Sequence, residues 1–231
     1  MPKYTQLFRE TEKKICGFLT DIGFKECLFP KLPTASQCVE LKKALPRLSE
    51  EWSKELVDAK LEQDIPSYPK EFTLSHWQCE PFYYYLKREK PQEPVRFFDR
   101  SGWSYRVETD IDDFRLFEFQ RIECVWTCPC DGTETLLNGL LEGLSHILGN
   151  MGLENRIVRK IEEEKSTNEK IVRDIEVELK GVGIVELVGC HVHGRLFVDG
   201  LRIDIPENFY TGCCGIGLNR IVNCLIKLGL S

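Results

Sequence analysis

Two β-rich segments follow one another near the middle of the chain, and they constrain the fold more than any other feature. VRFFDRSGWSYRVE occupies residues 95–108 and FRLFEFQRIECVW occupies residues 114–126, with only the polar TDIDD between them. Both segments are rich in β-branched and aromatic side chains, which favour strands, and therefore predict a long antiparallel hairpin. The apolar face of such a hairpin has to be buried against other elements of the same domain.

The remaining apolar patterns predict helices around this sheet. Apolar residues recur at helical spacing in residues 4–22, 136–148 and 215–228, and two shorter helical patterns within 36–62 are split at Pro46. Further strands are predicted at 24–29, 171–179, 183–192, 194–200 and 201–205, and the charge run at 162–170 is interpreted as a solvated loop or edge. The predicted fold class is α+β, an antiparallel β-sheet flanked by helices, in a single domain spanning residues 1–231.

Composition excludes several classes of protein. No apolar run approaches the ~20 residues that span a bilayer, and the N-terminus lacks the apolar core of a signal peptide, so we expect a cytoplasmic protein without a membrane partner. The 11 cysteines favour reduced thiols or a metal site over a disulfide framework. A net charge of −6 argues against nucleic-acid binding by the whole surface.

Charged side chains are concentrated on the predicted hairpin. Strand alternation places Arg106 and Glu108 on one face of the first strand, and Arg115, Arg121 and Glu123 on one face of the second. One interpretation is a solvated face with ion pairs. The other is an anion site in which arginines bind phosphate or carboxylate and an aromatic ring stacks on a base.

The segment YTGCCGIGLNR, residues 210–220, is interpreted as a glycine-flanked turn that leads into the terminal helix. The free backbone N–H groups at a helix N-terminus favour an anion. Arg220 lies one to two turns into the predicted helix and could reach the same site.

Together these motifs resemble the catalytic core of the class II aminoacyl-tRNA synthetases. The likeness is greatest to the zinc-dependent, methanogen-type seryl-tRNA synthetases and to the amino acid:[carrier protein] ligases. The first helix with GFKECLFPKL resembles motif 1, with its proline at Pro30, FFDRSGWSYRVE…DDFRLFEFQRIE resembles motif 2, and TGCCGIGLNR resembles motif 3. The match to motif 2 is the most specific of the three.

The resemblance implies an ATP site and a role for each matching residue. Arg106 would hold the α-phosphate and the substrate carboxylate, Glu108 would contact the adenine or the substrate amine, and Arg115 would reach the outer phosphates. Phe119 would stack under the adenine, Arg220 would cover its other face, and Glu186 would help to hold Mg²⁺–ATP. Such chemistry requires positioning and charge neutralisation but no covalent catalyst.

The resemblance also implies a zinc site. Cys79, Glu123 and Cys213 stand where the zinc-dependent branch has its ligands, and Cys214 could replace Cys213 if the turn is shifted. Two thiolates and a carboxylate would leave one open position on Zn²⁺ for the α-amine of an amino acid. The alternative is a set of buried structural thiols.

The substrate pocket is expected beside the zinc site. It would include Arg121, Cys190 and His191, although the family usually has asparagine at the position of His191. A small or polar amino acid is the expected substrate.

The expected reaction is ATP-dependent activation of a small amino acid as its aminoacyl-adenylate, followed by transfer to the phosphopantetheine thiol of a carrier protein. The acids of TDIDDF would repel phosphate, and residues 1–3 leave no room for an N-terminal tRNA-binding domain, so tRNA is the less favoured acceptor. The alternatives are a free-standing enzyme that charges tRNA or a small molecule, and a non-catalytic regulatory paralogue. Motif 1 further implies a homodimer that meets at the first helix and the strand leading to Pro30.

Overall fold

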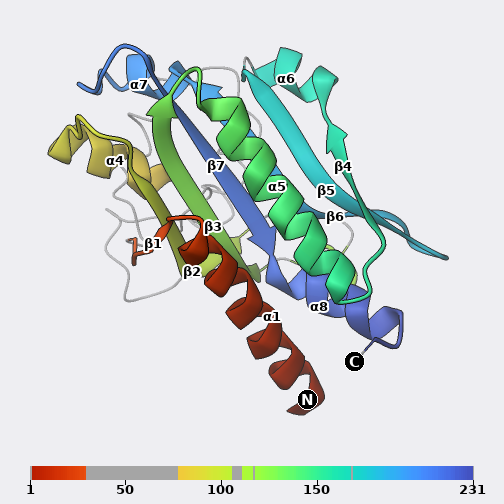
Figure 1. The fold of residues 1–231 in the computed structure, drawn as a ribbon. Helices are drawn as coiled ribbons and strands as arrows, with labels where there is room; N and C mark the ends of the chain where they lie inside the picture. Colours follow the sequence, from red (N-terminus) through yellow and green to blue (C-terminus); the bar gives the residue numbers. More distant parts are fainter. Residues whose placement is uncertain (1, 30–77, 106–110, 117, 168, 231) are drawn as a thin grey trace, which may run out of the picture.

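The structure is a computed structural model, and it describes residues 2–29, 78–105, 111–116, 118–167 and 169–230. Its centre is one seven-stranded sheet with the strand order β1-β2-β3-β7-β6-β5-β4 (Figure 1). The strands are β1 (Lys25–Glu26), β2 (Arg96–Tyr105), β3 (Glu118–Pro129), β4 (Asn155–Arg159), β5 (Ile171–Leu179), β6 (Gly183–Gly194) and β7 (Phe209–Gly217). The predicted helices within 36–62, and the predicted site residues Arg106 and Glu108, lie outside the described residues.

The predicted hairpin is the pair β2 and β3. It is antiparallel from the pair Arg96 and Trp126 to the pair Tyr105 and Glu118. The other neighbouring strands are also antiparallel, except that the short β1 runs parallel to β2. Strand β7 lies between β3 and β6, so its side chains are supported by neighbours on both sides.

Helices cover both faces of the sheet. The helices are α1 (Pro2–Asp21), α4 (Glu80–Glu89), α5 (Thr133–Asn150), α6 (Ile161–Thr167), α7 (Leu196–Gly200) and α8 (Leu218–Lys227). Helices α1, α5 and α8 bury their apolar stripes in the larger core cluster, and α1 and α5 lie across the near face of the sheet in Figure 1. Helices α4 and α7 contribute to a second cluster that contains Val125 and Cys213 of the sheet. The predicted α+β class, with a sheet flanked by helices, is thereby confirmed.

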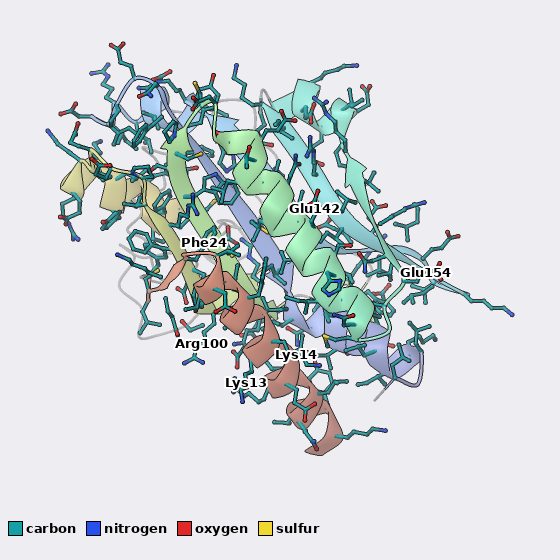
Figure 2. All side chains as sticks on the ribbon, in the orientation of Figure 1. Lys13, Lys14, Phe24, Arg100, Glu142 and Glu154 are labelled. Carbon is teal, nitrogen blue, oxygen red and sulfur yellow. The ribbon has the colours of Figure 1, made fainter. Side chains whose placement is uncertain are left out.

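The outer surface of the α1–α5 layer is charged. Lys13 and Lys14 of α1 and Glu142 of α5 are exposed on this layer, and the exposed Glu154 lies in the connection between α5 and β4 (Figure 2). In α5, Leu137, Leu140, Leu141, Leu144 and Leu148 are buried, at the spacing of one helical face. No helix of the described residues combines the length and hydropathy that crossing a membrane requires.

Three predictions of secondary structure were wrong. Residues 194–200 and 201–205 are not strands; instead the helix α7 buries Phe197 and Val198 in the second cluster. The charge run is partly the helix α6, whose first turn carries three glutamates that the positive end of the helix dipole stabilises. The terminal helix starts at Leu218, so residues 209–217 continue as the strand β7. The glycines of this segment are therefore sites where side chains of neighbouring strands lie close to the backbone.

Gly212 illustrates this close approach. A Cβ atom there would overlap the buried Trp126 ring and lie 2.8 Å from the carbonyl oxygen of His191. Because neither the ring nor the backbone can move freely, we expect Gly212→Ala to lower the free energy of unfolding by about 1–3 kcal/mol in chemical denaturation. Gly139→Ala is the control, since no atom lies within 4 Å of its added Cβ and the change favours the helix. Equal stability of the two variants would contradict the packing at β7.

Candidate active site

Three buried donors from separate elements converge on one point. Cys79 caps the start of α4, Cys213 lies in the middle of β7, and His193 lies near the end of β6. Their ligand atoms all lie within 4.8 Å of one another, and the three residues are 5–7% exposed. His193 Nε2 lies 3.3 Å from Cys213 Sγ. Two sulfurs and an imidazole nitrogen form a donor set that suits Zn²⁺.

A carboxylate and two aromatic rings fix the orientation of the His193 imidazole. His193 Nδ1 lies 2.6 Å from Glu169 Oε1, and His191 Nδ1 lies 2.9 Å from the other oxygen of the same carboxylate. The Phe197 ring meets the His193 ring edge to face at 4.7 Å, and it stacks on Tyr83 at 4.3 Å. The imidazole can therefore rotate little, and its Nε2 stays directed at Cys213.

Glu169 is an anion held between the two histidines. Burial alone would raise its pKa, but the hydrogen bonds with His191 and His193 hold the pKa of Glu169 well below its ordinary value. Burial likewise opposes ionisation of His191, but Glu169 raises the pKa of His191 to about 9. Burial lowers the pKa of His193, which is therefore neutral at pH 7. The pair thus combines a cationic His191 with a neutral, metal-competent His193.

Glu123 lies next to this cluster on β3. It is 1% exposed, and the Cys213 thiol is within hydrogen-bonding reach of its carboxylate. Arg121 Nη2 lies 3.1 Å from Glu123 Oε2, yet this ion pair lacks hydrogen-bond geometry, and Oε2 has no hydrogen-bond partner among the described residues. Burial raises the pKa of Glu123, and Arg121 opposes that shift. Glu123 therefore has an acceptor oxygen available for a cation or an ammonium group.

Arg121 connects this carboxylate to the start of α4. Its Nε donates to Gln78 Oε1 at 2.7 Å, and its guanidinium lies over Gly215, where an added Cβ would be 3.1 Å from Nη1. The amide nitrogen of Gln78 is buried and has no hydrogen-bond partner among the described residues. The Gln78 amide, the Arg121 guanidinium and the Glu123 carboxylate thus lie together beside the cluster.

A second group lies farther along the same strands, where β7 passes into α8. Arg220 Nε donates to the carbonyl of Phe114 at 2.8 Å, and Nη1 donates to the carbonyl of Glu186 at 3.1 Å. The Arg220 guanidinium carbon lies 5.9 Å from the centre of the Phe119 ring, and Nη1 lies 3.7 Å from Glu186 Oε1. The structure therefore brings together three residues that the sequence predicts for ATP binding.

A carboxylate that was not predicted joins Glu186. A Cβ added to Gly189 would lie 3.1 Å from Glu186 Oε1 and 3.6 Å from Asp174 Oδ1, so both carboxylates converge over this glycine. Lys160 Nζ lies 3.4 Å from Asp174 Oδ2. Burial, followed by the neighbouring Glu186, raises the pKa of Asp174 to about 7. Two oxygen donors at one point suit a hard divalent cation such as Mg²⁺.

The remaining predicted residues are distributed as follows. Arg115 is exposed, and its backbone N–H bonds Asp112 Oδ1 at 2.7 Å in the turn before β3. Cys190 is fully buried in the larger core cluster, on the face opposite His191. Cys214 lies in the same cluster, where the strand register pairs it with Cys124 of β3 and Cys190 of β6. Successive side chains of a strand point to opposite faces, so Cys213 rather than Cys214 faces Cys79.

His193 and Glu169 were not among the site residues predicted from the sequence. The alternation of HVH in β6 puts both histidines on one face, and this was an available signal that they could share a partner. Glu169 lies in the connection before β5, within a charge run, and nothing in the sequence distinguishes it from its neighbours.

The chain has relatives among known proteins. No family model matches the chain. The chain is 32% identical to the type-2 serine–tRNA ligase of Methanothermobacter thermautotrophicus, over 95% of its own length and 50% of that protein. It is 30% identical to the type-2 serine–tRNA ligase of Methanocaldococcus jannaschii, over 100% of its own length and 52% of that protein. The chain is a relative of the type-2 serine–tRNA ligases.

Solved structures show the same fold. The structure of a Methanopyrus kandleri SerRS in complex with A. aeolicus tRNASec matches 96% of this chain and 52% of the SerRS chain, with a TM-score of 0.71 and 24% identity. The Giardia lamblia prolyl-tRNA synthetase in complex with prolyl-adenylate matches 96% of the chain and 45% of its own, with a TM-score of 0.76 and 14% identity. The predicted class II aminoacyl-tRNA synthetase fold is confirmed. The chain spans about half the length of the type-2 serine–tRNA ligases it matches.

Proposed function

We propose that the chain activates an amino acid with ATP and forms an aminoacyl-adenylate. The observation that carries this proposal is the group of Phe119 on β3, Glu186 on β6 and Arg220 on α8. Strand β6 also carries His193 of the buried cluster, and β7, which leads into α8, carries Cys213. A nucleotide site and an amino-acid site side by side are what adenylation requires. The likeness to the type-2 serine–tRNA ligases supports the same reaction and makes serine the first candidate substrate.

In this reaction an oxygen of the substrate carboxylate attacks the α-phosphorus of ATP. A new O–P bond forms, the bond between the α-phosphorus and the bridging oxygen breaks, and pyrophosphate leaves with the electron pair. Negative charge on the phosphates is neutralised by arginines, for which we propose Arg106, Arg115 and Arg220. Of these, the structure describes Arg115 and Arg220, and we further propose that Glu108 contacts the adenine or the amine.

Arg220 has to move when the adenine enters. A base stacked between Phe119 and the guanidinium needs about 7–8 Å, which is two van der Waals separations of about 3.5–4 Å. The guanidinium carbon now lies 5.9 Å from the centre of the ring. The carbonyls of Phe114 and Glu186 hold the guanidinium in place and could guide this small opening.

Glu186 and Asp174 are proposed to hold the Mg²⁺ of Mg²⁺–ATP. Since a carboxyl with a pKa of about 7 must lose its proton before it binds a cation, affinity for Mg²⁺–ATP should rise about tenfold per pH unit below pH 7 and level off above it. Calorimetric titration at pH 5.5–8.5 measures this dependence. Asp174→Asn should remove this dependence and leave only the titration of ATP itself. If wild type and variant have the same slope, Asp174 does not bind the cation.

The thiolates of Cys79 and Cys213 are proposed to hold Zn²⁺ beside the amino-acid pocket, with Glu123 or His193 as the third donor. Burial of the donors, their mutual distances and the orphaned Glu123 oxygen all fit a metal ion. Bound there, the metal would supply a Lewis-acidic position for the α-amine. Arg121 and His191, both close to this position, are proposed to line the pocket, whereas Cys190 faces the core.

Two acceptors of the activated amino acid, tRNA and a carrier protein, are proposed, each on a separate ground. The relatives are named serine–tRNA ligases, which favours tRNA. Asp112 and Asp113 are exposed in the connection between β2 and β3 and would repel a phosphate backbone, which favours the thiol of a carrier protein. Transfer of a radiolabelled amino acid to serine tRNA or to a phosphopantetheinylated carrier protein distinguishes the two.

We also propose that two copies associate through α1 and the segment after β1. Leu28, directly after this strand, is 75% exposed and could pack against a second copy. Amino-acid-dependent exchange of pyrophosphate into ATP tests the proposed activity itself.

A further inference from the structure

The buried cluster allows a more specific assignment of the metal ligands. We propose that His193, through its Nε2 atom, is the third protein ligand of the metal beside Cys79 and Cys213, and that Glu169 is the positioning residue that orients its imidazole. The proposal rests on the proposed zinc site. Glu123, the carboxylate expected from the sequence as a ligand, would then lie beside the metal without binding it.

The spacing of the donor atoms fits a metal ion. Tetrahedral Zn²⁺ with bonds of about 2.0–2.3 Å keeps its ligand atoms roughly 3.3–3.8 Å apart. The ligand atoms of Cys79, His193 and Cys213 lie within 4.8 Å of one another, and the distance from His193 Nε2 to Cys213 Sγ is 3.3 Å. Glu123 reaches the Cys213 thiol but is not a member of this mutually close trio. Small side-chain shifts are thus enough for the trio to close on a metal.

A hydrogen bond to Glu169 orients the His193 ring from the side away from Cys213. A metal-bound histidine almost always donates its other ring N–H to a carboxylate, a carbonyl or water, which fixes the tautomer. Glu169 Oε1 is 2.6 Å from His193 Nδ1, and a carboxylate oxygen accepts a hydrogen bond from the ring N–H, which places the proton on Nδ1. The lone pair of Nε2 then faces Cys213. A histidine that only fills the core would not need its free nitrogen directed at a thiol.

A second histidine, His191, shares the Glu169 carboxylate with His193. His191 binds the other oxygen of Glu169, and its ring stacks on His193 with the centroids 6.0 Å apart. His191 is nevertheless not a member of the trio, and its side chain is 27% exposed. One carboxylate thus orients two imidazoles, of which one faces the thiols and the other borders the pocket.

Metal binding at this site would release two protons. The Cys79 and Cys213 thiols lose their protons to solvent, Nε2 gives a lone pair without losing a proton, and three bonds to the metal form. The fourth position remains for a substrate amine or water. Glu123, with its orphaned oxygen beside that position, can accept a hydrogen bond from a bound ammonium or amine.

Zinc K-edge X-ray absorption on the purified full chain tests the assignment directly. We expect two sulfur neighbours and the multiple-scattering pattern of one imidazole. That pattern should persist in His191→Ala and Glu123→Gln and disappear in His193→Ala. Zinc affinity, measured by competition with a chromophoric chelator, should fall about 10–100-fold in Glu169→Gln and further in His193→Ala. His146→Ala, on the exposed side of α5, is the matched histidine control and should change neither quantity.

The outcomes separate this assignment from the proposed reaction. Two sulfurs without an imidazole in the wild-type protein, or an imidazole pattern that survives in His193→Ala, would overturn the assignment while leaving zinc-dependent activation intact. A wild-type protein that binds no zinc would overturn both the assignment and the proposed zinc site. An imidazole from His193 in a protein without pyrophosphate exchange would support the assignment and contradict the proposed reaction. Circular dichroism of every variant verifies that it is folded.

Discussion

Cys213→Ser should lose zinc and, with it, amino-acid-dependent pyrophosphate exchange. Cys213 is the one donor that contacts all the others, since His193 Nε2 lies 3.3 Å from its sulfur and both the Cys79 thiol and the Glu123 carboxylate are within hydrogen-bonding reach. A hydroxyl remains protonated at neutral pH and is a poor ligand for Zn²⁺. We expect zinc affinity to fall by at least about 100-fold, the upper end of what losing even an outer partner costs.

The measurement is zinc content after dialysis, together with exchange activity in the same preparation. Cys130→Ser is the matched control, because Cys130 is exposed in the turn after β3 and lies apart from the cluster. It should keep both zinc and activity. A second variant, Cys214→Ser, changes the neighbouring thiol on the opposite face and should retain zinc if it folds. Stoichiometric zinc in folded Cys213→Ser protein would contradict the proposed site.

Arg220→Ala should lower the rate of pyrophosphate exchange by about 10²–10³-fold, the cost of losing one donor to developing charge. Two carbonyls and the Phe119 ring hold the guanidinium at the start of α8, where it can meet both the base and the outer phosphates. Arg220→Lys keeps the charge but not the planar surface that stacks, so it should recover only part of the rate.

Steady-state kinetics in ATP separate the two roles of this residue. A stacking role raises the KM for ATP, whereas stabilisation of the transferring phosphate lowers kcat. Arg195→Ala is the control, because Arg195 bonds Asp199 and three carbonyls near α7, outside the proposed site. Unchanged exchange in folded Arg220→Ala protein would remove Arg220 from the nucleotide site.

Much of the fold follows from the sequence because its signals are local. The β-rich hairpin and the leucine stripe of α5 each carry their periodicity within one segment, and both appear as predicted. The error at residues 209–217 has a physical cause. Glycines usually mark turns, but in β7 they accommodate Trp126 and Arg121 from the neighbouring strand. Such close approach depends on pairing between distant segments, which a local pattern does not reveal.

Prediction of the site residues is limited by the same dependence on pairing between distant segments. The convergence of Cys79 with Cys213 was predicted through the resemblance, and the structure places the two together. His193 lies beside Cys213 because β6 pairs with β7, with an irregular register between Val192 and Gly194, and Glu169 reaches His193 from the connection before β5. Tertiary pairing of this kind decides which of several histidines and acids share a site. The sequence alone does not distinguish these residues from the other histidines and acids.

Exchange of pyrophosphate into ATP, measured on zinc-replete protein with each of the twenty amino acids, tests the central claim most directly. Arg106→Ala and Cys213→Ser serve as inactive references. We predict exchange with serine or with one or a few other small amino acids, absent from both variants. Folded, zinc-containing protein that exchanges pyrophosphate with none of the twenty would contradict amino-acid activation and leave a binding or regulatory role for the same site.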